Sequence, residues 1–109
     1  MVFLFAWFPK VQIIGDSMLP TYREGEEIRA RRILRVDPLK VNDVYVFKEP
    51  VCGRPVIKRL SAVCQDEDGN TLCYFEGDNS SVSFDSRNYG WVSRKRIIAK
   101  ALFSRDKSA

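Results

Sequence analysis

The chain has 109 residues, 45% hydrophobic and 29% charged, which is typical of one globular domain and too short for two. Its net charge of +4 is spread among acids rather than gathered into a basic stripe, which argues against a nucleic-acid-binding protein and suits an anionic surface such as lipid. The chain has no histidine, which excludes a Ser-His-Asp triad. We therefore expect no metal, no cofactor and no nucleic-acid partner.

The first eight residues are apolar and include Trp7. They are far fewer than the ~20 residues that span a bilayer, and they lack the basic start and cleavage site of a secretory signal. We expect residues 1–10 to form an apolar arm over the core or a membrane-contacting edge. Membrane association would then be peripheral, unless the natural chain is longer and carries an anchor.

Short apolar runs separated by turn residues fill the rest of the chain, and none keeps a period of 3.6 residues. The run 44–47 is apolar on both faces and should be a central strand. A turn is expected at residues 66–70, and a polar loop at residues 77–90. The strands that we predict cover residues 11–14, 27–34, 44–47, 55–63, 71–76 and 97–103.

This pattern predicts a mainly β fold, a compact coiled antiparallel sheet or barrel-like domain. Residues 11–103 should form the single domain, which would carry any catalytic site, and residues 104–109 a frayed, charged tail. Cys52, Cys64 and Cys73 are odd in number and lack metal-ligand spacing. We interpret them as small buried hydrophobic residues in a reducing compartment.

Ser17 lies in the segment Gly15-Asp16-Ser17-Met18-Leu19-Pro20, where a nucleophile could be presented. Gly15 would let a substrate backbone approach closely, and Pro20 would fix the chain beyond while holding Leu19 extended. The Ser17 amide could face a developing oxyanion. Taken alone, Gly-Asp-Ser is more often an ordinary turn.

Lys58 lies inside the apolar run Pro55-Val56-Ile57-Lys58-Arg59-Leu60 and would share a strand face with residues 56 and 60. Apolar neighbours disfavour the charged amine, which lowers its pKa. A neutral amine could take the proton of Ser17 and return it to a leaving group. The alternative is a lysine that extends along the sheet to water.

The loop 77–90 is rich in serine, asparagine and aspartate. We expect Asx turns at Asp78 and Asn79, and a charge contact between Asp85 and Arg87. Its hydroxyl groups could orient an amine. The alternative is a plain solvated loop.

Four segments in this order, Ser-Met-Leu-Pro-Thr, Lys-Val-Asn-Asp-Val-Tyr-Val-Phe, Val-Ile-Lys-Arg and Gly-Asp-Asn with Ser-Phe-Asp-Ser-Arg-Asn-Tyr-Gly, extend the argument. The series resembles the signal peptidase I family of serine proteases, which use a Ser-Lys dyad, and covers residues 14–101. The resemblance implies Ser17 as nucleophile, Lys58 as general base, and Ser83 as the hydroxyl that orients the lysine. The residues that it implies as supports of the site are Gly77, Asp78, Asp85 and Arg87, with Gly15, Met18 and Pro20 shaping the turn of the nucleophile.

Two departures from the larger bacterial enzymes point to a compact branch of that family. One short hairpin joins Lys58 to Gly77, and the N-terminal anchor is missing or reduced. These features are similar to nickel superoxide dismutase maturation proteases and mitochondrial inner-membrane peptidases. Some family members offer an oxyanion-hole hydroxyl two positions before the nucleophile, where this chain has Gly15.

The function expected from the sequence is a serine endopeptidase that removes an N-terminal leader or signal peptide from a precursor protein. A maturation protease for a soluble metalloenzyme such as nickel superoxide dismutase is the first alternative. A self-cleaving repressor domain is disfavoured, because nothing before Val11 could be a helix-turn-helix. A non-catalytic peptide-binding β-domain would apply if Ser17 and Lys58 lie apart. The location would be membrane-associated or, as the alternative, cytoplasmic.

Overall fold

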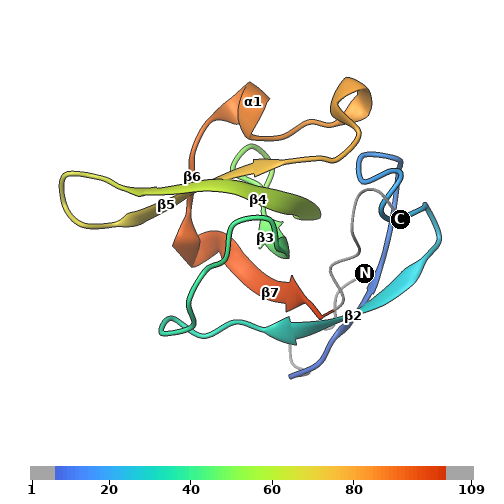
Figure 1. Ribbon diagram of the computed structural model, residues 1–109, viewed down its shortest axis with the longest axis horizontal. Coiled ribbons are helices and arrows are strands. Elements are labelled where there is room, and N and C mark those ends of the chain that lie inside the picture. Colours follow the sequence, from blue (N-terminus) through green and yellow to red (C-terminus); the bar gives the residue numbers. More distant parts are fainter. Residues whose placement is uncertain (1–6, 103–109) are drawn as a thin grey trace.

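The computed structural model describes residues 7–102 and shows one antiparallel sheet in that part of the chain. Its strand order is β1-β2-β7-β3-β4-β5-β6, and each strand is antiparallel to its neighbours. The prediction of a mainly β fold is therefore confirmed (Figure 1). The strands are β1 (Lys10–Gln12), β2 (Glu27–Arg32), β3 (Val44–Lys48), β4 (Pro55–Gln65), β5 (Thr71–Glu76), β6 (Val92–Ser93) and β7 (Ile97–Ala101).

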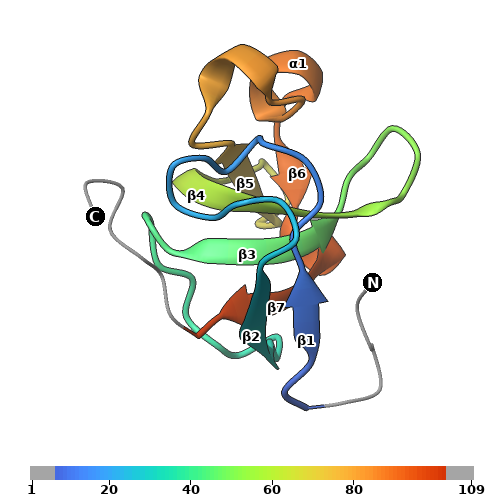
Figure 2. The ribbon, with the colours of Figure 1, turned by 90° about the vertical axis from the view of Figure 1, so that its right-hand side faces the viewer.

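The sheet is strongly coiled, so that β1 and β2 run across the direction of β3 (Figure 2). Register shifts between Val46 and Phe47 and between Leu60 and Ala62 interrupt the pairing of β3 with β7 and of β4 with β5. Such irregularities increase the local twist of a sheet. The coiling brings the turn after β1 beside the first half of β4, although the two are about 40 residues apart in sequence.

The central position predicted for residues 44–47 is confirmed, since β3 lies between β7 and β4 and all four residues are buried. Because side chains alternate along a strand, Tyr45 and Phe47 pack into one hydrophobic cluster while Val44 and Val46 face two others. The Phe47 ring stacks on Phe75 with ring centroids 4.1 Å apart. Both faces of the sheet are thus covered at β3.

The predicted polar loop 77–90 contains two short helices, η1 (Ser80–Val82) and α1 (Ser86–Tyr89). In α1, the Asp85 side chain accepts from Arg87 N and the Asn88 side chain accepts from Asp85 N, which forms a capping box. Gly90 ends the helix at φ +85°. A helix of four residues has too little periodicity to be seen in a hydrophobic pattern, and the same holds for β6 and for η2 (Arg94–Arg96).

Several predicted boundaries shift. The first strand begins one residue earlier and ends at Gln12, β2 ends at Arg32, and β4 continues to Gln65. Cys73 is buried, but Cys64 is half-buried and Cys52 is exposed, so the prediction of three buried cysteines is wrong for Cys52. Cys52 lies in the β3–β4 hairpin loop, where the chain folds back in solvent.

Most of the predicted N-terminal arm (residues 1–6) and all of the predicted tail (residues 104–109) lie outside the described residues. Within the described part, Trp7 and Phe8 are 44% and 49% exposed. Between residues 7 and 102, no helix has the length and apolar character needed to cross a membrane.

Candidate active site

Ser17 lies in the turn between β1 and β2 and is half-buried. The next residue, Met18, is 1% exposed and packs with Ile13 and Tyr22 in a hydrophobic cluster, which fixes the turn to the core. Hydrogen bonds from Leu19 N to Asp16 O (3.2 Å) and from Tyr22 N to Met18 O (2.9 Å) close the turn. The serine hydroxyl is therefore held by buried packing directly behind it.

Gly15 adopts φ +82°, and a Cβ atom there would meet nothing within 4 Å. The backbone conformation rather than crowding thus calls for glycine at this position. Close approach of a substrate backbone to Gly15 stays a prediction. Pro20 is exposed and follows Leu19 in the same turn.

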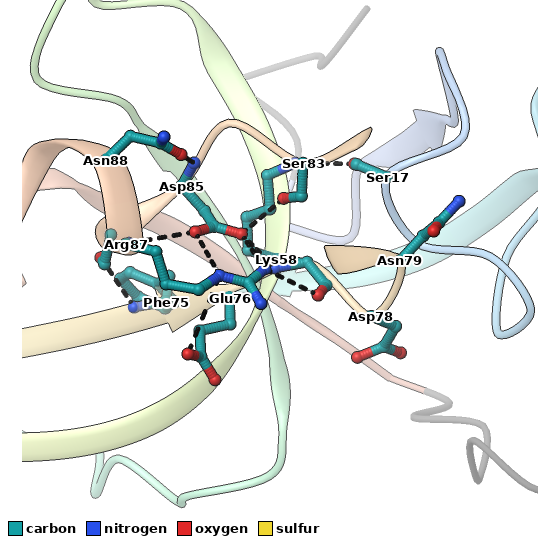
Figure 3. A network of polar contacts seen from close by, with 12 residues as sticks. Ser17, Lys58, Phe75, Glu76, Asp78, Asn79, Ser83, Asp85, Arg87 and Asn88 are labelled. Carbon is teal, nitrogen blue, oxygen red and sulfur yellow. Dashed lines mark hydrogen bonds and ion pairs between the residues drawn. The ribbon is translucent and has the colours of Figure 1, made fainter. Parts of the chain in front are cut away.

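Lys58 lies on β4 opposite Tyr45 of β3 and is 5% exposed. Its Nζ atom lies 2.6 Å from Ser17 Oγ. Figure 3 marks this hydrogen bond with a dashed line. The alternative of a lysine that extends to water does not fit this burial. Among the described residues, Ser17 is the one hydrogen-bond partner of this amine.

The electrostatic surroundings of Lys58 favour the neutral amine. Burial lowers the pKa of Lys58, the Asp85 carboxylate opposes this decrease, and the Arg87 guanidinium adds to it. The net direction is downward from the ordinary value of 10.5. An amine with a lowered pKa is available as a proton acceptor over a wider range of pH than an exposed one.

Asp85 is fully buried and anchors the loop beside the lysine (Figure 3). Its oxygens accept hydrogen bonds from Gly77 N (2.8 Å), from Ser83 Oγ (2.6 Å) and from three nitrogens of Arg87, of which Nη2 is 2.5 Å away. Burial alone would raise the pKa of Asp85, but these hydrogen bonds hold it well below its usual range. The predicted charge contact between Asp85 and Arg87 is confirmed.

Gly77 lies where three parts of the site meet. A Cβ atom at this position would lie 2.2 Å from Ser83 Oγ and 2.8 Å from Ser17 O, both too close for any real contact. Glycine is therefore required here by the close approach of two other segments. The absence of a side chain lets the loop pass directly behind the nucleophile turn.

Ser83 is placed beside the site, but its hydroxyl donates to Asp85 Oδ2. No hydrogen bond joins Ser83 to Lys58 within residues 7–102. Orientation of the lysine by Ser83 stays a prediction, and in this structure any such influence passes through Asp85.

A second ion pair, which the sequence did not reveal, holds the strand of Lys58 to the loop. Arg59 donates from Nε (2.9 Å) and Nη2 (2.8 Å) to the two oxygens of Asp78, whose side chain is 1% exposed. Thr21 Oγ1 also donates to Asp78 Oδ2, at 2.5 Å. Arg59 follows Lys58 in sequence, so its side chain points to the opposite side of β4. The sequence therefore gave no signal that Arg59 has a role at the site.

Asn79 joins the same loop to the nucleophile turn. Its backbone N donates to Ser17 O (2.8 Å), and its side-chain nitrogen donates to Asp16 O (3.1 Å). The Asp78 carboxylate and the Asn79 side-chain nitrogen bond to distant segments, whereas Asn79 Oδ1 accepts a local hydrogen bond from Ser81 Oγ (3.1 Å). The Asx turns at Asp78 and Asn79 stay a prediction. These long-range partners could not be read from local sequence.

Ser17 and Lys58 line a groove of about 450 Å³. One side of the groove is formed by residues 11–17, and the other by residues 54–58 of the hairpin loop and β4. In β4, residues 55–58 pair with β3, whereas the recorded pairing with β5 starts at Arg59. Exposed apolar residues rim the groove: Ile14, Val82 and Phe84.

This arrangement can perform nucleophilic chemistry on an extended chain. A hydroxyl and a buried amine lie within hydrogen-bond distance, and two strand edges flank them. Within the described residues, no cluster of side chains has the composition of a metal site.

Comparison with known proteins finds similarity to catalytic subunits of signal peptidase complexes. The chain is 28% identical over 104 residues to the "Signal peptidase complex catalytic subunit sec11" of Dictyostelium discoideum, covering 93% of this chain and 57% of the relative. It is 24% identical over 96 residues to "Signal peptidase complex catalytic subunit SEC11C" of Homo sapiens and of Mus musculus, covering 85% of this chain and 50% of each relative. The chain thus spans about half the length of the curated relatives it matches. No family model matches it.

Proposed function

We propose that the chain is a serine endopeptidase that removes an N-terminal leader or signal peptide from a precursor protein, with Ser17 as nucleophile and Lys58 as general base. One observation carries the proposal: a lysine amine that is 5% exposed lies 2.6 Å from a serine hydroxyl at the wall of a groove. Similarity to catalytic subunits of signal peptidase complexes supports the same activity.

The reaction follows from the two side chains. Lys58 Nζ takes the proton as Ser17 Oγ attacks the scissile carbonyl, and the resulting ammonium returns it to the leaving amine. Water then attacks the acyl carbon and gives a proton to Lys58, and Lys58 returns that proton to Ser17 Oγ as the bond between Ser17 and the acyl group breaks. The Ser17 backbone N–H, for which residues 7–102 offer no hydrogen-bond acceptor, would donate to the oxyanion.

The substrate would lie in the groove as an added strand, between residues 12–14 and residues 55–58. Main-chain hydrogen bonds would supply affinity, and side-chain pockets would supply selectivity. The apolar lining from Val11, Val46 and Ile57 favours small apolar side chains next to the cut bond.

Asp85 and Arg87 would support the dyad without touching the substrate, Gly77 would allow the close packing behind Ser17, and Asp78 would hold the loop against β4.

Membrane contact through Trp7 and Phe8 is part of the proposal, because half-exposed aromatic rings suit an interface. A maturation protease acting on a soluble metalloenzyme uses the same chemistry and differs in the precursor alone. The condition that would have favoured a non-catalytic β-domain, separation of Ser17 from Lys58, is not met.

The experiment that tests this proposal is mass spectrometry of two kinds of precursor incubated with the protein. One carries an exported leader and the other is the precursor of nickel superoxide dismutase. We expect a single cut near the end of one leader, and no cut with Ser17→Ala or Lys58→Ala. The matched controls are Ser61→Ala and Lys48→Ala, exposed residues that do not line the groove. Full activity of Lys58→Ala would remove the lysine from the mechanism, and cleavage of neither precursor at any enzyme concentration would contradict the proposal.

A further inference from the structure

A second hollow, of about 660 Å³, lies at the other end of the sheet from Ser17. It is bounded by the β4–β5 hairpin, by η2 and by residues 33–35, which Figure 1 shows on the side away from the turn after β1. Its volume is in the range of ligand-binding pockets, about 300–1,000 Å³. None of its lining residues belongs to the candidate active site.

The inner wall of this hollow is apolar. Ile33, Leu72 and Ile97 are buried or half-buried there, and Leu34 is 47% exposed at the rim. Exposed apolar side chains beside a concave surface gain free energy when another apolar group covers them. The wall therefore favours an occupant with apolar side chains.

The rim of the hollow is positively charged. Arg35 and Lys95 are both exposed, and no ion pair is recorded for either one between residues 7 and 102. Arg94, between them, donates from Nη2 to Leu34 O (3.0 Å) and to Asp37 O, which fixes its guanidinium at the edge. These three cations line one hollow.

Asp66 is the single acidic residue that lines the hollow, and its carboxylate already accepts hydrogen bonds within its own turn. Its carboxylate accepts from Asp68 N (2.9 Å), from Asn70 N (2.9 Å) and from Asn70 Nδ2 (3.1 Å), which closes the β4–β5 turn. Its single negative charge is outnumbered by Arg35, Arg94 and Lys95, which leaves an excess of two positive charges among the lining residues. The hollow thus keeps a net positive field over an apolar wall.

We propose that this hollow binds a short acidic segment with interspersed apolar side chains, supplied by a partner protein. Carboxylates of the segment would meet Arg35 and Lys95, and its apolar side chains would cover Leu34 and Leu72. A concave site fits a peptide better than a membrane, which needs protruding apolar groups. A single-stranded nucleic acid would use aromatic stacking surfaces, and none of the lining residues is aromatic, while the phosphates of a duplex would not cover the apolar wall. The proposal does not depend on the function of the dyad.

The test uses fluorescein-labelled hexapeptides with alternating Glu and Leu, and matched peptides with alternating Gln and Leu or Lys and Leu. Binding is followed by fluorescence anisotropy at low and at physiological salt. We expect the Glu-Leu peptide to bind at least tenfold more tightly than the other two. Arg35→Glu combined with Lys95→Glu should weaken it at least tenfold, and Leu34→Ser severalfold.

The control variant is Arg29→Glu combined with Lys48→Glu, which reverses two exposed charges outside the hollow and should change affinity less than twofold. All substituted side chains are exposed, which protects the fold. Three outcomes would overturn the proposal: no binding of the Glu-Leu peptide at low salt, an equal loss in the control variant, or binding of phosphatidylserine vesicles with no binding of the peptide.

Discussion

The loop around Asp85 and the strand around Lys58 both bury an ionisable group, but they surround it differently. Asp85 is fully buried and accepts five hydrogen bonds, three of them from Arg87. Lys58 is 5% exposed, and its recorded hydrogen bond is the one to Ser17. The hydrogen bonds of Asp85 outweigh the cost of its burial and keep it charged, whereas the Asp85 carboxylate offsets the burial of Lys58 only in part, so that the neutral amine is favoured. The hydrogen bonds of Asp85 thus hold the loop together, and Lys58, with a single recorded hydrogen bond, is the group that we propose as the base.

The largest expected effect comes from removing the amine of Lys58. Lys58→Met keeps the length and the apolar stem but deletes the base, so we expect leader cleavage to fall by about 10²- to 10⁴-fold. Because a buried amine with a lowered pKa binds fewer protons in the folded state than in the unfolded one, it destabilises the fold below pH 10.5. Lys58→Met should therefore raise Tm at pH 7. A lower Tm would show that the lysine stabilises the fold.

Removing the charge of Asp85 should have the opposite effect on stability. We expect Asp85→Asn to lower the free energy of unfolding by about 2–3 kcal/mol, which is less than the value for breaking a fully buried pair, because Arg87 is 35% exposed and can turn to water. Urea unfolding measures the change, with the exposed Asp68→Asn as the control. A change no larger than that of the control would mean that the Asp85 network does not stabilise the loop.

Gly77→Ala tests the contact between the two regions. The new methyl group would be placed 2.8 Å from Ser17 O, so the loop or the nucleophile turn must move, at a cost of about 1–3 kcal/mol. Cleavage should fall further than stability alone explains, because the turn carries Ser17. Gly69→Ala is the control for backbone strain alone, because Gly69 has φ +82° in the β4–β5 turn and its Cβ meets nothing within 4 Å. Equal activity of the two variants would show that Gly77 does not help to position Ser17.

The smallest expected effect is a shift in the pH dependence of cleavage, and it tests the contrast between Lys58 and Asp85 most directly. Only the deprotonated amine accepts a proton, so kcat/KM for leader cleavage should rise with pH through the pKa of Lys58. We expect this rising limb below the ordinary lysine value of 10.5. A limb centred at that value in the measured pH profile would mean that burial does not tune the amine.

Local patterns were enough to predict most of the strands and to single out Ser17 and Lys58, which the structure brings together. The run 44–47, apolar on both faces, predicted the central position of β3, and the absence of histidine left Lys58 as the candidate base. The motif near Asp85 pointed to its pairing with Arg87, because the two are close in sequence and α1 brings them together. Short elements such as α1 and β6 were missed, because four or two residues carry no period.

The sequence by itself determined which groups this protein has available: an alcohol after a glycine turn, an amine in an apolar strand, and a loop rich in acids and hydroxyls. The tertiary structure alone decided their partners, since the coiled sheet brings Ser17 within 2.6 Å of Lys58 and pairs Arg59 with Asp78. It also turned Ser83 toward Asp85 and not toward the lysine. The physical reason is that burial and long-range hydrogen bonds depend on how strands far apart in sequence coil together, which no local pattern encodes.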